Sequence, residues 1–292
     1  MKLYLDCIQC VFRQVLQAAR FCGADEAAQE RLLRKTMAIL QKHDWDCSPM
    51  DLAQPVLEMV KAETGEKDPY LEVKRQGNRE AQAHTGHVIE KIEAAEDPIN
   101  VALKAAIGGN IIDYGAQASF DLDETMDRVF SMEFALNDEA ALLEALRDAE
   151  SIAYLGDNAG EIVFDKLLLE TVERIHGPKR VIFVVRDEPL LNDALLEDAR
   201  EVGLSGMPGV ELVGMPPRLP AEGDRHASLW ERISACDMII SKGQGNYEGF
   251  SSIPGIFFLL MAKCDLIARD INSRTGANLK LGDMILWHGD GS

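Results

Sequence analysis

The stretch Ser151–Phe164, SIAYLGDNAGEIVF, decides the fold that we expect for this chain. Its apolar beginning, Ile152–Leu155, predicts a buried strand, and the residues from Glu161 onward predict a helix. The five residues Gly156–Gly160, GDNAG, form an abrupt polar turn between the two. In open α/β sheets, ligands bind at the carboxyl ends of the strands, so we expect this turn to lie at a binding edge.

The chain after Ser151 repeats this alternation of short apolar runs and amphipathic segments. Such a pattern predicts a mostly parallel sheet with helices on both faces. The expected strands are Ile152–Leu155, Arg180–Val185, Val210–Val213 and Met238–Ser241, with shorter ones at Leu266–Ala268 and Met284–Trp287. The expected helices are Glu161–Ile175, Leu190–Val202, Ala227–Ala235 and Ile253–Lys263.

The first half of the chain predicts helices instead. Apolar residues recur at helical spacing, and three X-Pro pairs are typical helix starts. The expected helices are Cys7–Phe21, Ala27–Lys42, one from Ser48-Pro49 through Val60, Tyr70–Ala95, Ile99–Ile107 and one or two within Phe120–Arg147. The fold class that follows is α/β, with a helical N-terminal domain, residues 1–150, packed on a Rossmann-like α/β/α domain, residues 151–292.

The composition excludes several classes of partner. Lys and Arg total 30 against 49 Asp and Glu, a formal net charge of −19, which argues against a nucleic-acid partner. There is no apolar run of about 18 residues, so we expect no membrane span. The start carries an early Asp6, unlike a secretion signal, and six cysteines are too few and scattered for a disulfide framework. We therefore expect a cytoplasmic protein with reduced thiols.

Polar side chains follow three of the expected strands. In a doubly wound sheet all three segments project from the same edge. Carboxylate and amide oxygens there suit a divalent cation, while a lysine and free backbone N–H groups suit phosphate. The set predicts metal-assisted phosphoryl chemistry. Its members are Asp157 and Asn158, then Arg186, Asp187, Asn192 and Asp193, then Ser241, Lys242, Gly243, Gln244, Gly245, Asn246 and Tyr247.

Each segment alone has a plainer interpretation. Asp157 and Asn158 between glycines are common in simple turns, because both side chains bond to their own backbone. Asp193 alone is typical of a solvated helix residue. Cys7 and Cys10 lie on one face of a helix, but no second Cys-x-x-Cys completes a zinc site, and burial without reactivity is the commonest fate of a thiol. The functional interpretation depends on the three strand ends acting together.

The motifs occur in a recognisable order along nearly the whole chain. They are Asp157–Glu161 with Asp165, Asn192-Asp193, Ser241–Gly243 with Asn246-Tyr247, Cys7-x-x-Cys10, Asp68–Tyr70 with Lys74 and Asn78, Gly109–Gly115 and Ala262–Cys264. In this order they resemble the metal-dependent damage-control phosphatases, also called the protein-glutamate methyltransferase-like family. The Cys-x-x-Cys start is similar to the mainly archaeal and bacterial branch.

The resemblance implies a divalent cation, Mg²⁺, Mn²⁺, Co²⁺ or Ni²⁺, held by Asp157, Asn158 and Asp193. It also implies a phosphate near Lys242, and a substrate that is a small phosphorylated metabolite such as a sugar phosphate, phosphopantetheine derivative or nucleotide. We expect Asp157, Asn158 and Lys242 to be catalytic. The expected substrate contacts are Asn110, Asp113, Gly160, Glu161, Ser241, Lys242, Gly243 and Asn246. One departure is Arg186–Pro189, where the family's pattern leads us to expect a glycine-containing turn.

Two other functions compete with a phosphatase. One is an S-adenosylmethionine-dependent methyltransferase acting on carboxylates, although GDNAGE lacks the usual glycine spacing of such a cofactor site. The other is a non-enzymatic metal- or metabolite-binding protein that uses Cys7 and Cys10. Within the phosphatase hypothesis, direct attack by water and a phospho-enzyme on Asp157 both remain open.

Overall fold

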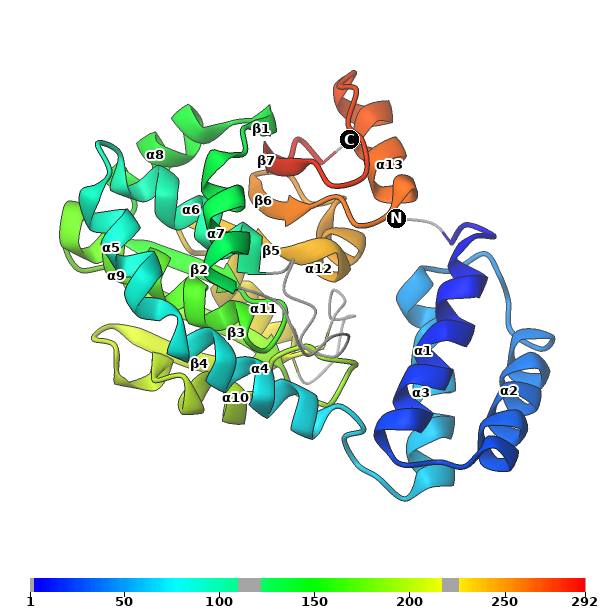
Figure 1. Ribbon diagram of the computed structural model, residues 1–292. Helices are drawn as coiled ribbons and strands as arrows, with labels where there is room; N and C mark the ends of the chain where they lie inside the picture. The colour runs from blue at the N-terminus through cyan, green and yellow to red at the C-terminus, as the bar shows by residue number, and fades with distance from the viewer. Residues whose placement is uncertain (1–2, 110–121, 217–225, 292) are drawn as a thin grey trace.

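A single seven-stranded sheet lies at the centre of the computed structural model, which describes residues 3–109, 122–216 and 226–291 (Figure 1). The strand order is β1-β7-β6-β5-β2-β3-β4, and every neighbouring pair is parallel except β6 with β7. The α/β fold class with a mostly parallel sheet is thereby confirmed. The strands are β1 (Phe134–Asn137), β2 (Ser151–Leu155), β3 (Arg180–Arg186), β4 (Val210–Met215), β5 (Met238–Lys242), β6 (Ile256–Met261) and β7 (Met284–His288).

Helices cover both faces of the sheet, as the two apolar clusters on either side of it demonstrate. Alternate residues of each strand face opposite clusters, so the sheet is buried on both sides. One layer contains α4 (Leu71–Ala83), α5 (Thr85–Ala94), α6 (Pro98–Gly108), α7 (Leu122–Ser131), α8 (Glu139–Asp148), α9 (Glu161–His176) and α10 (Leu196–Glu201). The other contains α11 (Ala227–Ser234), α12 (Gly243–Phe250) and α13 (Asp265–Thr275).

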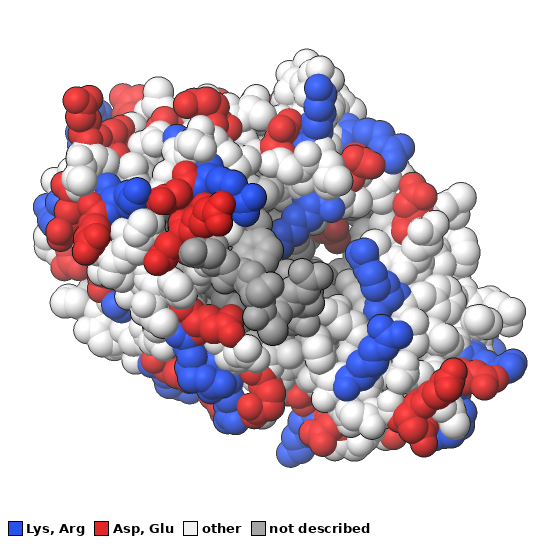
Figure 2. All heavy atoms as spheres, viewed as in Figure 1, with Lys and Arg blue, Asp and Glu red and all other residues white. Residues whose placement is uncertain are grey.

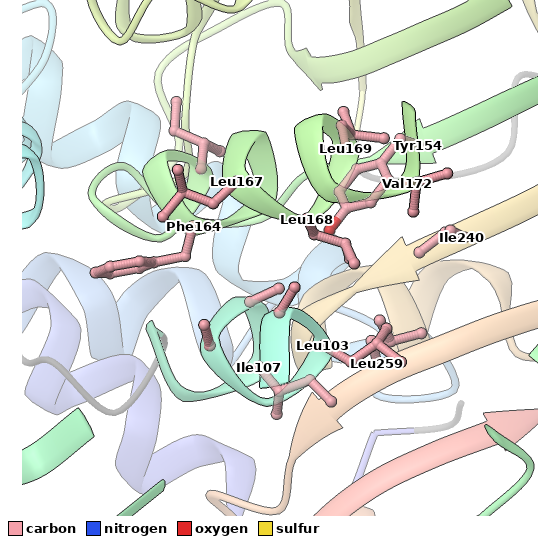
Figure 3. Close-up of a cluster of buried hydrophobic side chains, with 14 of the residues drawn as sticks. Leu103, Ile107, Tyr154, Phe164, Leu167, Leu168, Leu169, Val172, Ile240 and Leu259 are labelled. Carbon is pink, nitrogen blue, oxygen red and sulfur yellow. The ribbon is translucent and has the colours of Figure 1, made fainter. Parts of the chain in front are cut away.

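The core beneath the first layer is densest between α6 and α9. Figure 3 shows Leu168 of α9 pointing toward α6, where Leu103 lies beside Leu259 of β6, with Ile240 on the neighbouring strand. Leu103 and Ile107 are fully buried. Burial of such a side chain contributes about 1.5–3 kcal/mol. This packing fixes the start of α9, and with it the polar turn that precedes that helix.

Three N-terminal helices form a separate bundle beside the α/β body (Figure 1). They are α1 (Cys7–Phe21), α2 (Glu26–Leu40) and α3 (Pro49–Thr64), and they share their own apolar cluster. The Nζ of Lys61 on α3 donates to the carbonyl oxygen of Pro189 at 2.8 Å, and Leu191 packs against the bundle. Pro189 and Leu191 both follow β3, so the bundle faces the carboxyl edge of the sheet.

The structure reverses two of the expected elements. Ile253–Lys263 was expected to be a helix, but Ile256–Met261 is the strand β6, buried on both faces between β5 and β7. A short apolar run has the same composition in a buried helix and in a buried strand. Leu266–Ala268 was expected to be a strand, but it begins α13, where Cys264 caps the first turn and Gly276 ends the helix in a left-handed conformation.

Other boundaries also differ from expectation. Residues 120–147 contain the edge strand β1 between α7 and α8, where only helices were expected, because four residues are too few to interrupt the helical pattern on either side. The single helix expected at Tyr70–Ala95 is divided at His84 into α4 and α5. The helix expected at Leu190–Val202 is limited to α10. The division into domains at residue 150 stays a prediction, although the sheet itself includes β1.

Within the described ranges, no helix has the length and apolar character needed to cross a membrane.

Candidate active site

Backbone pairing between two loops brings the proposed metal ligands together. The N–H of Ala159 donates to the carbonyl of Asn192 at 3.0 Å, and the N–H of Ala194 donates to that of Asp157 at 2.8 Å. Asn158 and Asp193 therefore face each other as an isolated antiparallel bridge. The turn after β2 and the loop after β3 are 35 residues apart in the chain, yet they form one rigid unit at the carboxyl edge of the sheet.

This unit carries an excess of buried negative charge. Asp157 and Asp193 are 7% and 8% exposed, and Glu161 is fully buried beside them. Burial, followed by the charges of Glu161 and Asp193, raises the pKa of Asp157 well above its usual range. The amide Nδ2 of Asn158 donates to Asp157 Oδ2 at 2.7 Å and, more weakly, to Glu161 Oε2 at 3.3 Å.

The donor chemistry of this unit fits a divalent cation. Two carboxylates and one amide are oxygen ligands of the kind that Mg²⁺ and Mn²⁺ prefer, and the mutual repulsion of the carboxylates is what a bound cation would relieve. Among the described residues, no three His, Cys, Asp or Glu side chains converge as a ligand set. The oxygen-bearing side chains of this unit that could hold a cation are Asp157, Asn158 and Asp193.

Gly243 leaves the space that Asp157 occupies. Its φ is +75°, and a Cβ at this position would lie 1.9 Å from Asp157 Oδ2, closer than any non-bonded contact. The carboxylate thus packs directly against the first turn of α12. The segment Gly243–Asn246, expected to be a glycine-rich turn, is this helix start. The missing side chain at Gly243 allows the loop after β2 and the helix after β5 to meet.

Lys242 is fully buried, and all three of its N–H donors are used. Its Nζ donates to Glu161 Oε1 at 2.6 Å, Asp165 Oδ1 at 2.7 Å and the carbonyl of Ala106 at 2.7 Å. An ammonium group has only three donors. Burial alone lowers the pKa of Lys242, but the charges of Asp165 and Glu161 outweigh it and hold the pKa above its usual range. In this structure Lys242 therefore holds Glu161 and Asp165 in place, and its contact with phosphate stays a prediction.

The N–H of Gly160 is likewise committed within the protein. It donates to Asn78 Oδ1 of α4 at 2.7 Å, so it is not available to a substrate in this structure. Asn78 in turn donates to Asp198 Oδ1 at 3.1 Å. Lys74, one turn earlier on α4, forms ion pairs with Asp198 and Asp68. Lys74 and Asn78 were expected only as residues that match the family's motif, and in the structure they support the polar turn from below.

Two other expected substrate contacts, Asn246 and Ser241, are buried within the protein. Asn246 Nδ2 donates to the carbonyls of Gly156 and Lys242, each at 2.9 Å, and so ties the end of β2 to α12. Ser241 Oγ is buried without a hydrogen-bond partner among the described residues. Asn110 and Asp113 lie outside the described residues.

Arg186 lies at the expected edge of the sheet, but its pairing with Asp193 was not predicted from the sequence. It ends β3, is 4% exposed, and donates from Nε to Asp193 Oδ2 at 2.6 Å. In the sequence it was one of the polar residues expected at the strand ends, and it was also part of a departure from the family's pattern. A strand of apolar residues that ends in an arginine, seven residues before an aspartate, is a signal of a buried charge pair that could have been used.

The cysteine pair belongs to the N-terminal bundle. Cys7 and Cys10 are free thiols in the first turn of α1, and burial raises the pKa of the Cys7 thiol. Raised pKa values are typical of unreactive cysteines. A separate surface hollow of about 410 Å³ includes Pro98 and His176 in its lining. His176 ends α9, so this hollow lies at the amino edge of the sheet, opposite the proposed ligands.

The surface is hollowed on the side where the bundle meets the α/β body. Figure 2 shows this hollow, with lysine and arginine side chains along the bundle side of it.

Comparison with known proteins agrees with this arrangement. The model of the damage-control phosphatase ARMT1-like domain matches residues 3–279. A damage-control phosphatase from Pyrococcus horikoshii is 30% identical, covering 95% of this chain and 96% of the relative, and one from Archaeoglobus fulgidus is 31% identical, covering 98% of each. A crystal structure of a DUF89 family protein from Pyrococcus horikoshii superimposes with a TM-score of 0.85 at 27% identity, covering 99% of this chain and 100% of that one. The chain therefore belongs to the damage-control phosphatase ARMT1-like family.

Proposed function

We propose that this protein is a divalent-metal-dependent phosphatase that hydrolyses a small phosphorylated metabolite. The observation that carries the proposal is the backbone pairing that joins Asp157, Asn158 and Asp193 at the carboxyl edge of the sheet. The names of the relatives from Pyrococcus horikoshii and Archaeoglobus fulgidus, both damage-control phosphatases, support the reaction class.

Each residue of the unit has a role in this proposal. Asp157, Asn158 and Asp193 would hold the cation, which when bound polarises the phosphoryl group as a Lewis acid. Lys242 and Asn246 hold the polar turn in place. Lys242 binds Glu161, and Asn246 holds the end of β2 against α12. Direct attack by water and attack by Asp157 are both compatible with a carboxylate at this place.

The proposal also covers the setting in which the enzyme works. The substrate is a small anion, such as a sugar phosphate, a phosphopantetheine derivative or a nucleotide, and the net charge of −19 argues against a nucleic-acid partner. The free thiols favour a cytoplasmic location. The methyltransferase alternative is disfavoured because the turn GDNAGE, residues 156–161, lacks the usual glycine spacing of an S-adenosylmethionine site.

The test is hydrolysis of p-nitrophenyl phosphate by metal-stripped protein after separate addition of Mg²⁺, Mn²⁺, Co²⁺ or Ni²⁺. We expect at least one cation to restore turnover in the wild-type protein. Asp157→Asn keeps the size of the side chain and removes its charge, so we expect turnover to fall by about a hundredfold or more. Asp148→Asn, an exposed site at the end of α8, is the matched control and is expected to keep full activity.

Two results would contradict the proposal. One is undiminished turnover in Asp157→Asn, which would place the chemistry elsewhere. The other is a folded wild-type protein that hydrolyses neither this ester nor a panel of sugar phosphates and nucleotides with any of the four cations. Tight binding of S-adenosylmethionine to the metal-free protein would then favour methyl transfer.

A further inference from the structure

We propose that Arg186 is a phosphate-binding residue of this site and acts together with the first turn of α12. The inference rests on the proposed function for the identity of the anion. It gives Arg186 the contact that the sequence analysis assigned to Lys242.

One nitrogen of Arg186 is held, and another is left without a partner. The Nε group donates to Asp193 Oδ2 at 2.6 Å, and the backbone N–H donates to the carbonyl of Ala194 at 2.9 Å, so both ends of the residue are fixed. The Nη2 atom is buried and has no hydrogen-bond acceptor among the described residues. Buried guanidinium nitrogens are nearly always hydrogen-bonded, because an unpaired one loses its hydration without replacement. An unpaired Nη2 at a ligand-binding edge therefore indicates an acceptor supplied by a ligand.

The unpaired nitrogen lies beside the start of α12. A Cβ on Gly245 would be 3.8 Å from Arg186 Nη2, and a Cβ on Gly243 would collide with Asp157. Arg186 and Asp157 thus both border the same helical turn. The first N–H groups of a helix have no acceptor within the helix, and no side chain caps α12. These N–H groups and the guanidinium together form a cradle for an anion next to the proposed cation ligands.

Arginine suits this position better than the neighbouring lysine. Lys242 has its three donors occupied by Glu161, Asp165 and a carbonyl, whereas a guanidinium has five donors in a planar fork. Arg186 can therefore hold Asp193 and still donate to a phosphate oxygen. Arg186 would thus contact both the phosphate and Asp193, a proposed cation ligand. These two contacts would set the distance between the phosphate and the cation.

The decisive measurement is the affinity of the Mn²⁺-loaded protein for inorganic phosphate, obtained by calorimetric titration. Mn²⁺ affinity is measured separately by electron paramagnetic resonance. Arg186→Lys keeps one positive charge near Asp193 but lacks the fork. We expect it to keep Mn²⁺ affinity within about threefold and to lose phosphate affinity by about tenfold or more. Arg180→Lys, at the opposite end of β3, is the matched control and is expected to bind both as the wild type does.

A second variant guards against a purely structural explanation. In Arg186→Ala, added methylguanidinium is expected to restore part of the phosphate affinity, whereas methylammonium at the same concentration is not. The inference is overturned if Arg186→Lys binds phosphate as tightly as the wild type does. It is also overturned if Mn²⁺ and phosphate affinity fall together and methylguanidinium restores neither, since Arg186 would then only position Asp193.

Failure of this inference is distinguishable from failure of the proposed function. Phosphate binding that depends on Arg186 in a protein that hydrolyses no ester would retain the anion site and reject the phosphatase. Metal-dependent hydrolysis that is unchanged in Arg186→Lys, with unchanged phosphate affinity, would retain the phosphatase and reject Arg186 as a phosphate ligand.

Discussion

Gly243 illustrates how a single hydrogen atom in place of a side chain determines the site. The position requires a positive φ, and it also requires the space that Asp157 Oδ2 fills. We expect Gly243→Ala to displace Asp157 and to lower Mn²⁺ affinity by about tenfold or more, measured by electron paramagnetic resonance.

The control for that prediction is Gly276→Ala. Gly276 has nearly the same φ, +71°, but nothing lies within 4 Å of the Cβ that would be added. Alanine is strained at a positive φ, so this variant should lose about 1 kcal/mol of unfolding free energy. It should bind Mn²⁺ as the wild type does. Equal Mn²⁺ affinity in the two variants would mean that the contact with Asp157 does not matter.

Glu248 of α12 predicts a pH dependence of stability. Burial, with a further contribution from the charge of Asp270, raises the pKa of Glu248 from 4.5 to about 7. A raised carboxyl pKa favours the folded state at low pH, and this advantage is lost as the pH rises through about 7. Relative to the wild type, Glu248→Gln should therefore gain about 1–2 kcal/mol of unfolding free energy between pH 5 and pH 8.

Urea unfolding at the two pH values measures this change. Glu231→Gln, an exposed site on α11, controls for the replacement of a glutamate as such. A difference between wild type and Glu248→Gln that stays constant from pH 5 to pH 8 would exclude a raised pKa at this residue.

Lys242 marks the limit of what the sequence could predict at this scale. Its place after a strand and before glycines correctly indicated the carboxyl edge of the sheet. The sequence contains no information on how many acceptors meet its Nζ, because Ala106, Glu161 and Asp165 reach it from α6 and α9. Residue type and strand position therefore predicted that Lys242 lies at the carboxyl edge of the sheet. Its hydrogen-bond acceptors depend on how α6 and α9 pack against that edge.

At the scale of elements, the spacing of apolar residues predicted long helices correctly but did not identify short buried strands. The helix expected at Cys7–Phe21 is α1 with the same bounds, since fifteen residues contain several turns of the pattern. The six residues Ile256–Met261 contain too few positions to separate a buried strand from a helix. The order of strands in the sheet was also beyond the sequence, because β7 joins β1 and β6 through contacts between distant segments.

The support that α4 gives to the polar turn is testable through Asn78. This side chain accepts from the Gly160 N–H and donates to Asp198, both within buried surroundings. We expect Asn78→Ala to lower the free energy of unfolding by about 2 kcal/mol and to speed hydrogen exchange in the segment 156–161. Gln82→Ala, on the exposed face of the same helix, should do neither. Unchanged exchange in that segment would exclude the supporting role.

At the scale of the whole molecule, a bound cation should stabilise the fold. The proposed ligands come from the ends of two neighbouring strands, and unfolding separates them. At a Mn²⁺ concentration about a hundred times the dissociation constant, we expect about 2.7 kcal/mol of added stability, seen as a higher midpoint of thermal unfolding.

Chelation should reverse this gain, and Asp193→Asn should abolish it while Asp148→Asn retains it. A midpoint that does not respond to Mg²⁺, Mn²⁺, Co²⁺ or Ni²⁺ in the wild-type protein would contradict a cation site formed by these loops.

The ion pair of Lys74 with Asp198 also determines whether the second half of the chain can be produced alone. The two residues are 124 positions apart, on either side of residue 150. A shortened gene for residues 151–292 would still encode every proposed cation ligand. Its product would bury Asp198 without its ammonium partner and leave the Gly160 N–H without Asn78, costs that a small unit does not tolerate. We therefore expect residues 151–292 expressed alone to be less stable than the same residues in the whole chain, as urea unfolding would measure.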